Sequence, residues 1–180
     1  LLHLINDLVD ISRIDAGELP IYKSVVNLNE LMNTIKNQFE GYRIDRSSHI
    51  DLQLKSTKGK KKILIYTDEA RLRQVLNNLL SNAFKYTDEG KVELGYTLRK
   101  KEEQLLFYVK DTGKGIPKKN HKIIFDRFKQ SDHPLNDVVR GTGLGLAIAR
   151  GITELMGGKM WLESELGEGS VFYFTIPFEE

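Results

Sequence analysis

The spacing of apolar residues predicts four helices, which cover residues 1–16, 28 to about 39, 69–86 and 144–156. In the first, Leu4, Leu8 and Ile11 recur at heptad spacing, and a second apolar row widens the stripe. Such a broad stripe is typical of a helix that packs on more than one neighbour. The third helix begins after the capping residue Asp68. Its buried stripe is predicted to be Leu72, Val75, Leu76, Leu79 and Ala83.

Alternating apolar and polar residues predict strands at 22–26, 50–54, 63–66, 92–98 and 105–109, and a final hairpin over 159–177. We expect 50–54 and 63–66, the latter the more buried, to form a hairpin across the lysine-rich turn at 58–62. A second hairpin is expected across a turn at 100–103. Helices that interleave with mostly hairpin-linked strands predict an α/β two-layer sandwich of a mixed, mostly antiparallel sheet and about three helices.

Composition narrows the classes of protein. The chain has 180 residues, of which 40% are hydrophobic and 29% charged, as in a globular protein. A net charge of +2 gives no support for a nucleic-acid partner. The absence of cysteine excludes disulfides and thiolate metal sites, and the four histidines lack metal-ligand spacing. No apolar run approaches the roughly 20 residues that cross a membrane.

The first candidate for chemistry lies on the third helix. Asn78, Asn82 and Lys85 follow one another at spacings of four and three, so they share one helix face at the edge of the apolar stripe. Asparagine is a poor residue for a helix interior. Its amide oxygen can bind a hard cation such as Mg²⁺, and a lysine one turn further can meet phosphate. A polar helix edge that faces solvent is the alternative.

The second candidate is the segment from Asp111 to Pro117, where an apolar strand runs directly into an acidic residue and two glycines, Gly113 and Gly115. Glycine lets a backbone approach a ligand closely. A carboxylate at a strand end can accept a hydrogen bond from an exocyclic amine such as that of adenine. An ordinary Asp-Gly turn explains the pattern equally well.

The third candidate is the glycine-rich run 140–146, which ends a long loop and opens the fourth helix. It fails the dinucleotide-binding pattern because Leu146 stands where glycine is required and no strand precedes it. The free backbone N–H groups at the start of a helix form an anion site. A simple hinge between loop and helix is the alternative.

The order of these three segments resembles the catalytic domain of sensor histidine kinases, which belongs to a wider superfamily with DNA gyrase, Hsp90-type chaperones and mismatch-repair ATPases. Residues 74–87 look like the N box of that family, 111–117 like its first Gly box, 124–128 like its F box and 141–146 like its second Gly box. Residues 4–17 resemble the end of the second helix of a dimerisation and phosphoacceptor domain.

The resemblance implies a Bergerat-type ATPase fold preceded by a helix from a dimerisation bundle. Residues 1–17 would end that helix, 18–27 would form a linker and the first strand, and 28–180 would form the ATP-binding catalytic domain, with a lid at about 114–141. The implied partners are ATP, the protein's own phosphoacceptor domain, a response-regulator receiver domain and a second copy in the full-length homodimer. The domain is expected in the cytoplasm, whether or not the full-length protein is anchored in the cell membrane.

The resemblance also implies roles for individual residues. Asn82 would bind Mg²⁺, and Asn78 would stand near the metal and the phosphates. Lys85 and Tyr86 would contact phosphate and sugar, Asp111 would recognise the adenine amine, and Arg127, with Arg140 as a second candidate, would meet phosphate charge from the lid side. The remaining predicted nucleotide-binding residues are Gly113, Gly115, Ile116, Phe128, Gly141, Thr142, Gly143, Leu144, Gly145 and Leu146.

Position 78 separates kinase from ATPase chemistry. In hydrolytic relatives, the corresponding residue looks like a glutamate that activates water, whereas an amide cannot take a proton from water. We therefore expect slow hydrolysis and transfer of the γ-phosphoryl group to a histidine. That histidine is expected upstream of Leu1, and His3 lacks the acidic and proline neighbours of the family's acceptor. The alternatives are an ATP-responsive interaction module, or an ATPase or serine kinase of the same superfamily.

Overall fold

The computed structural model of the chain describes residues 2–45, 49–55, 62–128 and 142–178. Its helices are α1 (Leu2–Asp15), α2 (Leu28–Asp45), α3 (Glu69–Tyr86) and α4 (Gly145–Leu155), with short 3₁₀ turns at Lys100–Glu102, Lys118–Asn120 and Ile123–Phe125. Its strands are β1 (Ser24–Asn27), β2 (His49–Lys55), β3 (Leu64–Thr67), β4 (Glu89–Arg99), β5 (Gln104–Asp111), β6 (Met160–Glu165) and β7 (Gly169–Pro177).

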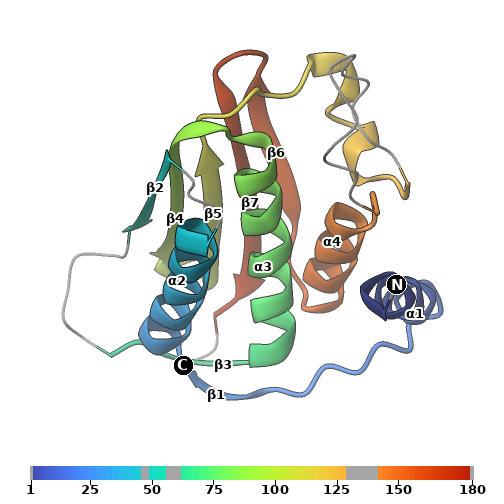
Figure 1. Cartoon of the computed structure of the whole chain (residues 1–180). Coiled ribbons are helices and arrows are strands. Elements are labelled where there is room, and N and C mark those ends of the chain that lie inside the picture. The colour runs from blue at the N-terminus through green and yellow to red at the C-terminus, as the bar shows by residue number, and fades with distance from the viewer. Residues whose placement is uncertain (1, 46–48, 56–61, 129–141, 179–180) are drawn as a thin grey trace.

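Five strands form the main sheet in the order β2-β4-β5-β7-β6. β2 pairs with β4 in parallel and the other pairs are antiparallel. Helices α2, α3 and α4 cover one face of this sheet, and α1 lies beyond them, beside α4 (Figure 1). The predicted two-layer sandwich with a mixed, mostly antiparallel sheet and three helices is confirmed. Among the residues that the structure describes, no helix is both long enough and apolar enough to span a bilayer.

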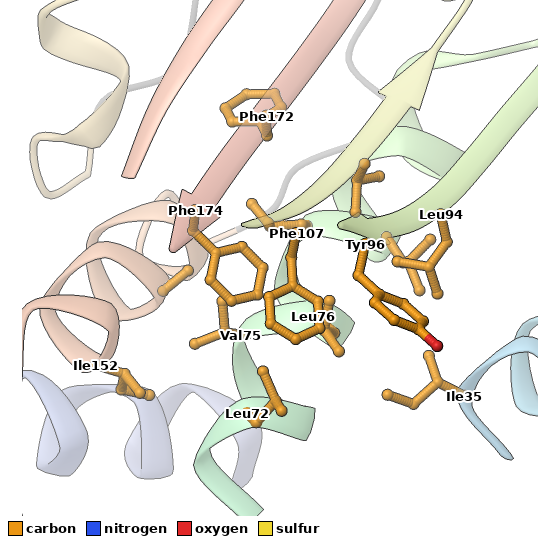
Figure 2. Close-up of a cluster of buried hydrophobic side chains, with 14 of the residues drawn as sticks. Ile35, Leu72, Val75, Leu76, Leu94, Tyr96, Phe107, Ile152, Phe172 and Phe174 are labelled. Atoms are coloured by element: carbon orange, nitrogen blue, oxygen red, sulfur yellow. The ribbon is translucent and has the colours of Figure 1, made fainter. Parts of the chain in front are cut away.

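The core is built around α3. The predicted stripe of this helix is buried, together with Leu80 and Phe84. In Figure 2, Leu72, Val75 and Leu76 lie against the stacked rings of Phe107 and Phe174, whose centroids are 4.8 Å apart. Full burial of one such side chain stabilises a fold by about 1.5–3 kcal/mol. The stripe therefore fixes the rotation of α3, and with it the direction in which the polar edge of the helix faces.

Two predicted elements differ in the structure. The expected hairpin of 50–54 with 63–66 is wrong, because β3 pairs with β1 in a separate two-stranded sheet while β2 pairs with β4. Nor is 63–66 the more buried of the two: Leu64 and Tyr66 are each nearly half exposed, and only Ile65 is buried between them. Most of the lysine-rich turn lies outside the described residues.

Helix α2 is longer than its pattern predicts. It continues six residues beyond Phe39, to Asp45. Phe39, Tyr42 and Phe84 form an aromatic cluster with ring centroids 5.5–6.3 Å apart. Contact with α3 thus supports an extra turn that carries few apolar residues of its own, even though Gly41 lowers its helix propensity.

Asp68 joins the start of α3 to the segment that follows α1. One carboxylate oxygen, Oδ1, accepts from the backbone N–H of Arg71 at 3.0 Å and caps the helix as predicted. The other, Oδ2, accepts from the backbone N–H of Tyr22 at 2.7 Å. The side chain is 4% exposed, so both donors would be left without a partner if it were removed.

We expect Asp68→Ala to lower the free energy of unfolding by about 1–3 kcal/mol, since it removes a helix cap and a second charged acceptor. The free energy of unfolding of Asp68→Asn should fall between those of wild type and Asp68→Ala, because its single amide oxygen can replace only one of the acceptors. Chemical denaturation measures the effect, with Asp88→Ala as the control, because the Asp88 side chain is 78% exposed. Equal stability of Asp68→Ala and Asp88→Ala would contradict this role.

Candidate functional site

A cavity of about 220 Å³ lies between the C-terminal half of α3 and the start of α4. It brings together most of the polar residues predicted on the third helix and in the second glycine-rich segment. The lining residues are Asp7, Asn78, Ser81, Asn82, Lys85, Tyr86, Ile124, Thr142, Gly143, Gly145 and Leu146. Segments that lie far apart in the sequence therefore meet at one site.

Asn78 links the two principal walls of the cavity. Its side-chain Nδ2 donates to the backbone carbonyl of Gly145, the first residue of α4, at 3.1 Å. This use of the N–H group leaves the amide oxygen, Oδ1, available to the cavity. Asn82 lies one turn further along the same face, and both side chains are half-buried. The face carries two amide oxygens of the kind that bind a hard cation.

The start of α4 forms the opposite wall. The helix begins at Gly145, and the first backbone N–H groups of a helix have no partner within it. Leu144 is fully buried and anchors this end in the core, while its N–H donates to Thr142 Oγ1 at 3.2 Å. A cavity wall made of free N–H groups at the positive end of a helix is suited to phosphate. Lys85 adds a formal positive charge on the α3 side.

Asp111 ends strand β5 and is 6% exposed. Burial raises the pKa of its carboxyl above the usual 3.8, although the backbone N–H groups of Gly113 and Ser170 donate to it and oppose that rise. Asp111 forms no ion pair with any described residue. A buried carboxylate without a counter-charge is costly in folding and is common at functional sites.

The first glycine-rich segment owes its glycines to contacts within the chain. A Cβ on Gly113 would collide with the carbonyl oxygen of Tyr86, and one on Gly115 with that of Glu165. Gly115 also has a φ of +69°, which favours glycine. These close approaches hold the segment after Asp111 between the end of α3 and the turn that follows β6. The nearby N–H of Ile116 donates to Ser164 Oγ at 2.8 Å.

Not every predicted residue lines the cavity. Arg127 pairs with Asp15 of α1, next to a separate cavity between α1 and α4. Phe128 is 63% exposed, and its N–H donates to the carbonyl of Gly143 at 3.0 Å. The cavity lining does not include Asp111, Gly113, Gly115 or Ile116, although Gly113 lies against the carbonyl oxygen of Tyr86, a lining residue. Gly141 and Arg140 lie outside the described residues.

Three lining residues were not predicted: Asp7, Ser81 and Ile124. Ser81 could have been predicted to line the cavity, because it lies beside Asn78 and Asn82 on α3. Ile124 lies in the short apolar stretch within the long loop. Asp7 had no signal in the sequence, because the predicted heptad row of α1 runs through Leu4, Leu8 and Ile11, and only the structure leaves Leu8 exposed and brings Asp7 to the cavity.

Comparison with known proteins identifies relatives of the chain. The family described as "Histidine kinase-, DNA gyrase B-, and HSP90-like ATPase" matches residues 67–180. The sensor histidine kinase WalK of Bacillus subtilis is 33% identical over 181 residues, which cover all of this chain and 29% of WalK. The circadian input-output histidine kinase CikA of Synechococcus elongatus is 37% identical over 98% of this chain and 23% of CikA. The chain thus spans less than a third of these relatives.

Solved structures agree with the sequence matches. The catalytic domain of the histidine kinase ThkA is 31% identical, with a TM-score of 0.72, and the match covers 87% of this chain and 98% of that domain. Full-length ShkA in complex with AMPPNP is 30% identical, with a TM-score of 0.85, over 98% of this chain and 35% of ShkA. The second match includes α1 as well as the sandwich, since it covers nearly the whole chain.

We predict that the buried carboxyl of Asp111 lowers the stability of the folded state by an amount that depends on pH. Because its pKa is raised on folding, the native state binds more protons than the unfolded state between the two pKa values, and stability falls as pH rises through that window. Below the unfolded pKa the cost is absent. Asp111→Asn should therefore become more stable relative to wild type as pH rises from about 3.5 to 7. Denaturant unfolding at several pH values measures the difference, and parallel stability curves would refute it.

Proposed function

Because the chain belongs to the histidine kinase-, DNA gyrase B- and HSP90-like ATPase family, and matches a histidine kinase catalytic domain over nearly its full length, we propose that ATP binds between α3 and α4 and donates its γ-phosphoryl group to a histidine of a dimerisation domain. The single observation that carries this proposal is the cavity in which Asn78, Asn82 and Lys85 face the first turn of α4, whose N–H groups have no partner within the helix. Such walls neutralise phosphate charge and hold it in place.

The two ends of the nucleotide meet different chemistry. The phosphates lie in the cavity, against Lys85 and the first turn of α4, while Tyr86 meets the sugar. The adenine lies toward Asp111, whose carboxylate accepts a hydrogen bond from the exocyclic amine. Burial of that carboxylate strengthens its discrimination, since a base with an acceptor at this place sets that acceptor against a buried anion and adds no donor to those of Gly113 and Ser170. Gly143 and Gly145 expose backbone N–H groups to the phosphates.

The residues present fit a magnesium ion. Asn78 donates its N–H group to Gly145, so its oxygen remains for the cavity, and Asn82 offers a second amide oxygen. Mg²⁺ prefers oxygen ligands and is commonly held together with substrate phosphates. When bound, it neutralises charge on the phosphates. Asn82 is its proposed protein ligand, and the position of Asn78 is fixed by its bond to α4.

Phosphoryl transfer relies on positioning and charge neutralisation more than on covalent chemistry by the protein. The side chain at position 78 is an amide and takes no proton from water. The cavity therefore binds the nucleotide without placing a carboxylate of α3 beside the γ-phosphate. This favours transfer to an incoming histidine over hydrolysis.

The proposed domain organisation assigns residues 1–17 to a dimerisation bundle, 18–27 to a linker with the first strand, and 28–180 to the catalytic domain. Helix α1 supports it through Ile5, Leu8 and Val9, which are 43–47% exposed and lie together on one side of the helix. An apolar face of this kind suits a neighbouring helix. A second copy of the chain is the proposed neighbour.

A response-regulator receiver domain is the proposed acceptor downstream of the histidine. The histidine kinase ThkA in complex with the response regulator protein TrrA matches 98% of this chain with a TM-score of 0.72 at 26% identity. Because that match covers nearly the whole chain, it includes α1 as well as the sandwich.

Asn82→Ala should weaken ATP binding by about 10–100-fold, because it removes the amide oxygen that is proposed to bind Mg²⁺ in the cavity. Asn77→Ala is the matched control: it lies on the same helix and lines the neighbouring groove that contains Phe39 and Tyr42, but it does not line the nucleotide cavity. Isothermal titration with a non-hydrolysable ATP analogue measures both. Equal affinities of the two variants would remove the basis of the site.

Asn78→Glu should shift the chain from transfer toward hydrolysis. Glutamate cannot donate to the carbonyl of Gly145, but it can accept a proton from water. We expect transfer of labelled phosphate from ATP to a purified phosphoacceptor domain to fall about tenfold or more, while phosphate release to water rises relative to it. If the variant leaves both rates unchanged, the role given to position 78 is wrong.

A further inference from the structure

We propose that the groove between α2 and α3 receives the helix that carries the phosphoacceptor histidine, and so orients that histidine toward the nucleotide. The inference rests on the proposed function of the cavity between α3 and α4, and it adds a docking surface outside that cavity. The groove has a volume of about 880 Å³ and is lined by residues of α2 and α3 alone.

The groove has a length that suits a docked helix. Its α3 wall runs from Ala70 to Ser81, which corresponds to about 17 Å at the rise of an α-helix. About three turns of a second helix fit along such a wall. The α2 wall includes Phe39, which is buried, and Tyr42, which is 41% exposed. Amphipathic helices bind with their apolar side in grooves that present aromatic surface in this way.

Gly41 widens the groove at the expense of α2. It lies inside that helix, where glycine lowers helix propensity. A Cβ at this position would have no described atom within 4 Å, so no contact within the described part of the chain requires glycine. Gly151 of α4 differs, because its Cβ would be 2.6 Å from Cγ2 of Ile14. The close approach of a partner helix gives Gly41 the reason that the chain's own packing does not.

The groove meets the nucleotide cavity along one edge of α3. Asn78 and Ser81 line both spaces. Among the residues that the structure describes, none from α2 lines the cavity, and Figure 1 shows α2 and α4 on opposite sides of α3. A helix in the groove therefore lies beside Asn78, where the γ-phosphoryl group is proposed to lie. Transfer requires the attacking nitrogen to come within roughly 3–3.5 Å of the phosphorus.

Helix α1 connects the groove with the dimerisation bundle. Gln74 lines the groove, and its Nε2 donates to Asp10 of α1 at 2.6 Å. The proposed domain organisation assigns α1 to the bundle that also contains the phosphoacceptor helix. Packed helices have axes roughly 8–10 Å apart, so a helix next to α1 lies within reach of the groove. This continuity is the reason why the phosphoacceptor helix is the proposed occupant.

Shape rather than charge should govern docking in the groove. Among the described residues, Arg73 is the one charged residue that lines it, and this arginine pairs with Glu69 on the same helix at 2.7 Å. Exposed pairs of this kind contribute little. A side chain that fills the groove should therefore prevent docking more effectively than a change of charge.

The test fills the groove from each wall in turn, with Gly41→Leu on α2 and Ala70→Leu on α3, in the full chain. Transfer of labelled phosphate from ATP to the purified phosphoacceptor domain is followed at increasing concentrations of that domain. We expect the KM for the phosphoacceptor domain to rise about tenfold or more in each variant, because leucine takes the place of the docked helix. Isothermal titration with a non-hydrolysable ATP analogue should give the wild-type affinity.

Asn33→Leu is the matched control, because Asn33 is exposed on α2 and does not line the groove. It should leave the KM unchanged. Gly41→Ala should also keep nearly the wild-type KM, since it adds a single methyl group and favours the helix. If both groove-filling variants match Asn33→Leu, or lose affinity for the ATP analogue in parallel, docking in the groove is wrong. Absence of analogue binding by wild type would instead refute the proposed function.

Discussion

The arrangement depends above all on the burial of one side of α3. Its apolar stripe is held between the rings of Phe107 and Phe174 on the sheet and the neighbouring helices. Because a helix side chain turns by a fixed angle per residue, burying that stripe determines where Asn78 and Asn82 face. They face the start of α4, whose own position is held by the buried Leu144. Core packing and the geometry of the cavity are therefore a single constraint, met by two sides of one helix.

The sequence predicted those parts in which the local pattern and the tertiary contact agree. The stripe of α3, its cap at Asp68 and the hairpin of β4 with β5 all satisfy nearby requirements that can be read in a short window. The hairpin of β2 with β3 failed because nearness in sequence did not decide pairing. β2 instead lies parallel to β4, a partner that it reaches only after the chain has passed through β3 and α3. Nothing within residues 50–66 encodes that choice.

In the candidate site, too, local spacing predicted some features and tertiary contacts decided the others. The spacing of Asn78, Asn82 and Lys85 was enough to predict that these three lining residues lie together, because helical periodicity fixes their relation. The role of the glycines could not be predicted from spacing alone. Gly113 and Gly115 were expected to admit a ligand, yet the atoms that approach them are the carbonyl oxygens of Tyr86 and Glu165. A glycine marks a place where something comes close, but its identity depends on contacts that only the folded chain defines.

Helix α1 carries two apolar rows on different sides, one packed on the sandwich and one exposed. Leu4, Ile11 and Ile14 face the sandwich, while Ile5, Leu8 and Val9 leave a separate apolar row open. At the exposed end of this contact, Asp15 pairs with Arg127, where charges contribute little. Asp7, which is half-buried, lies on the same side of α1 and lines the cavity between α3 and α4. The contact of α1 with the sandwich is therefore apolar at Leu4, Ile11 and Ile14 and polar where it borders that cavity.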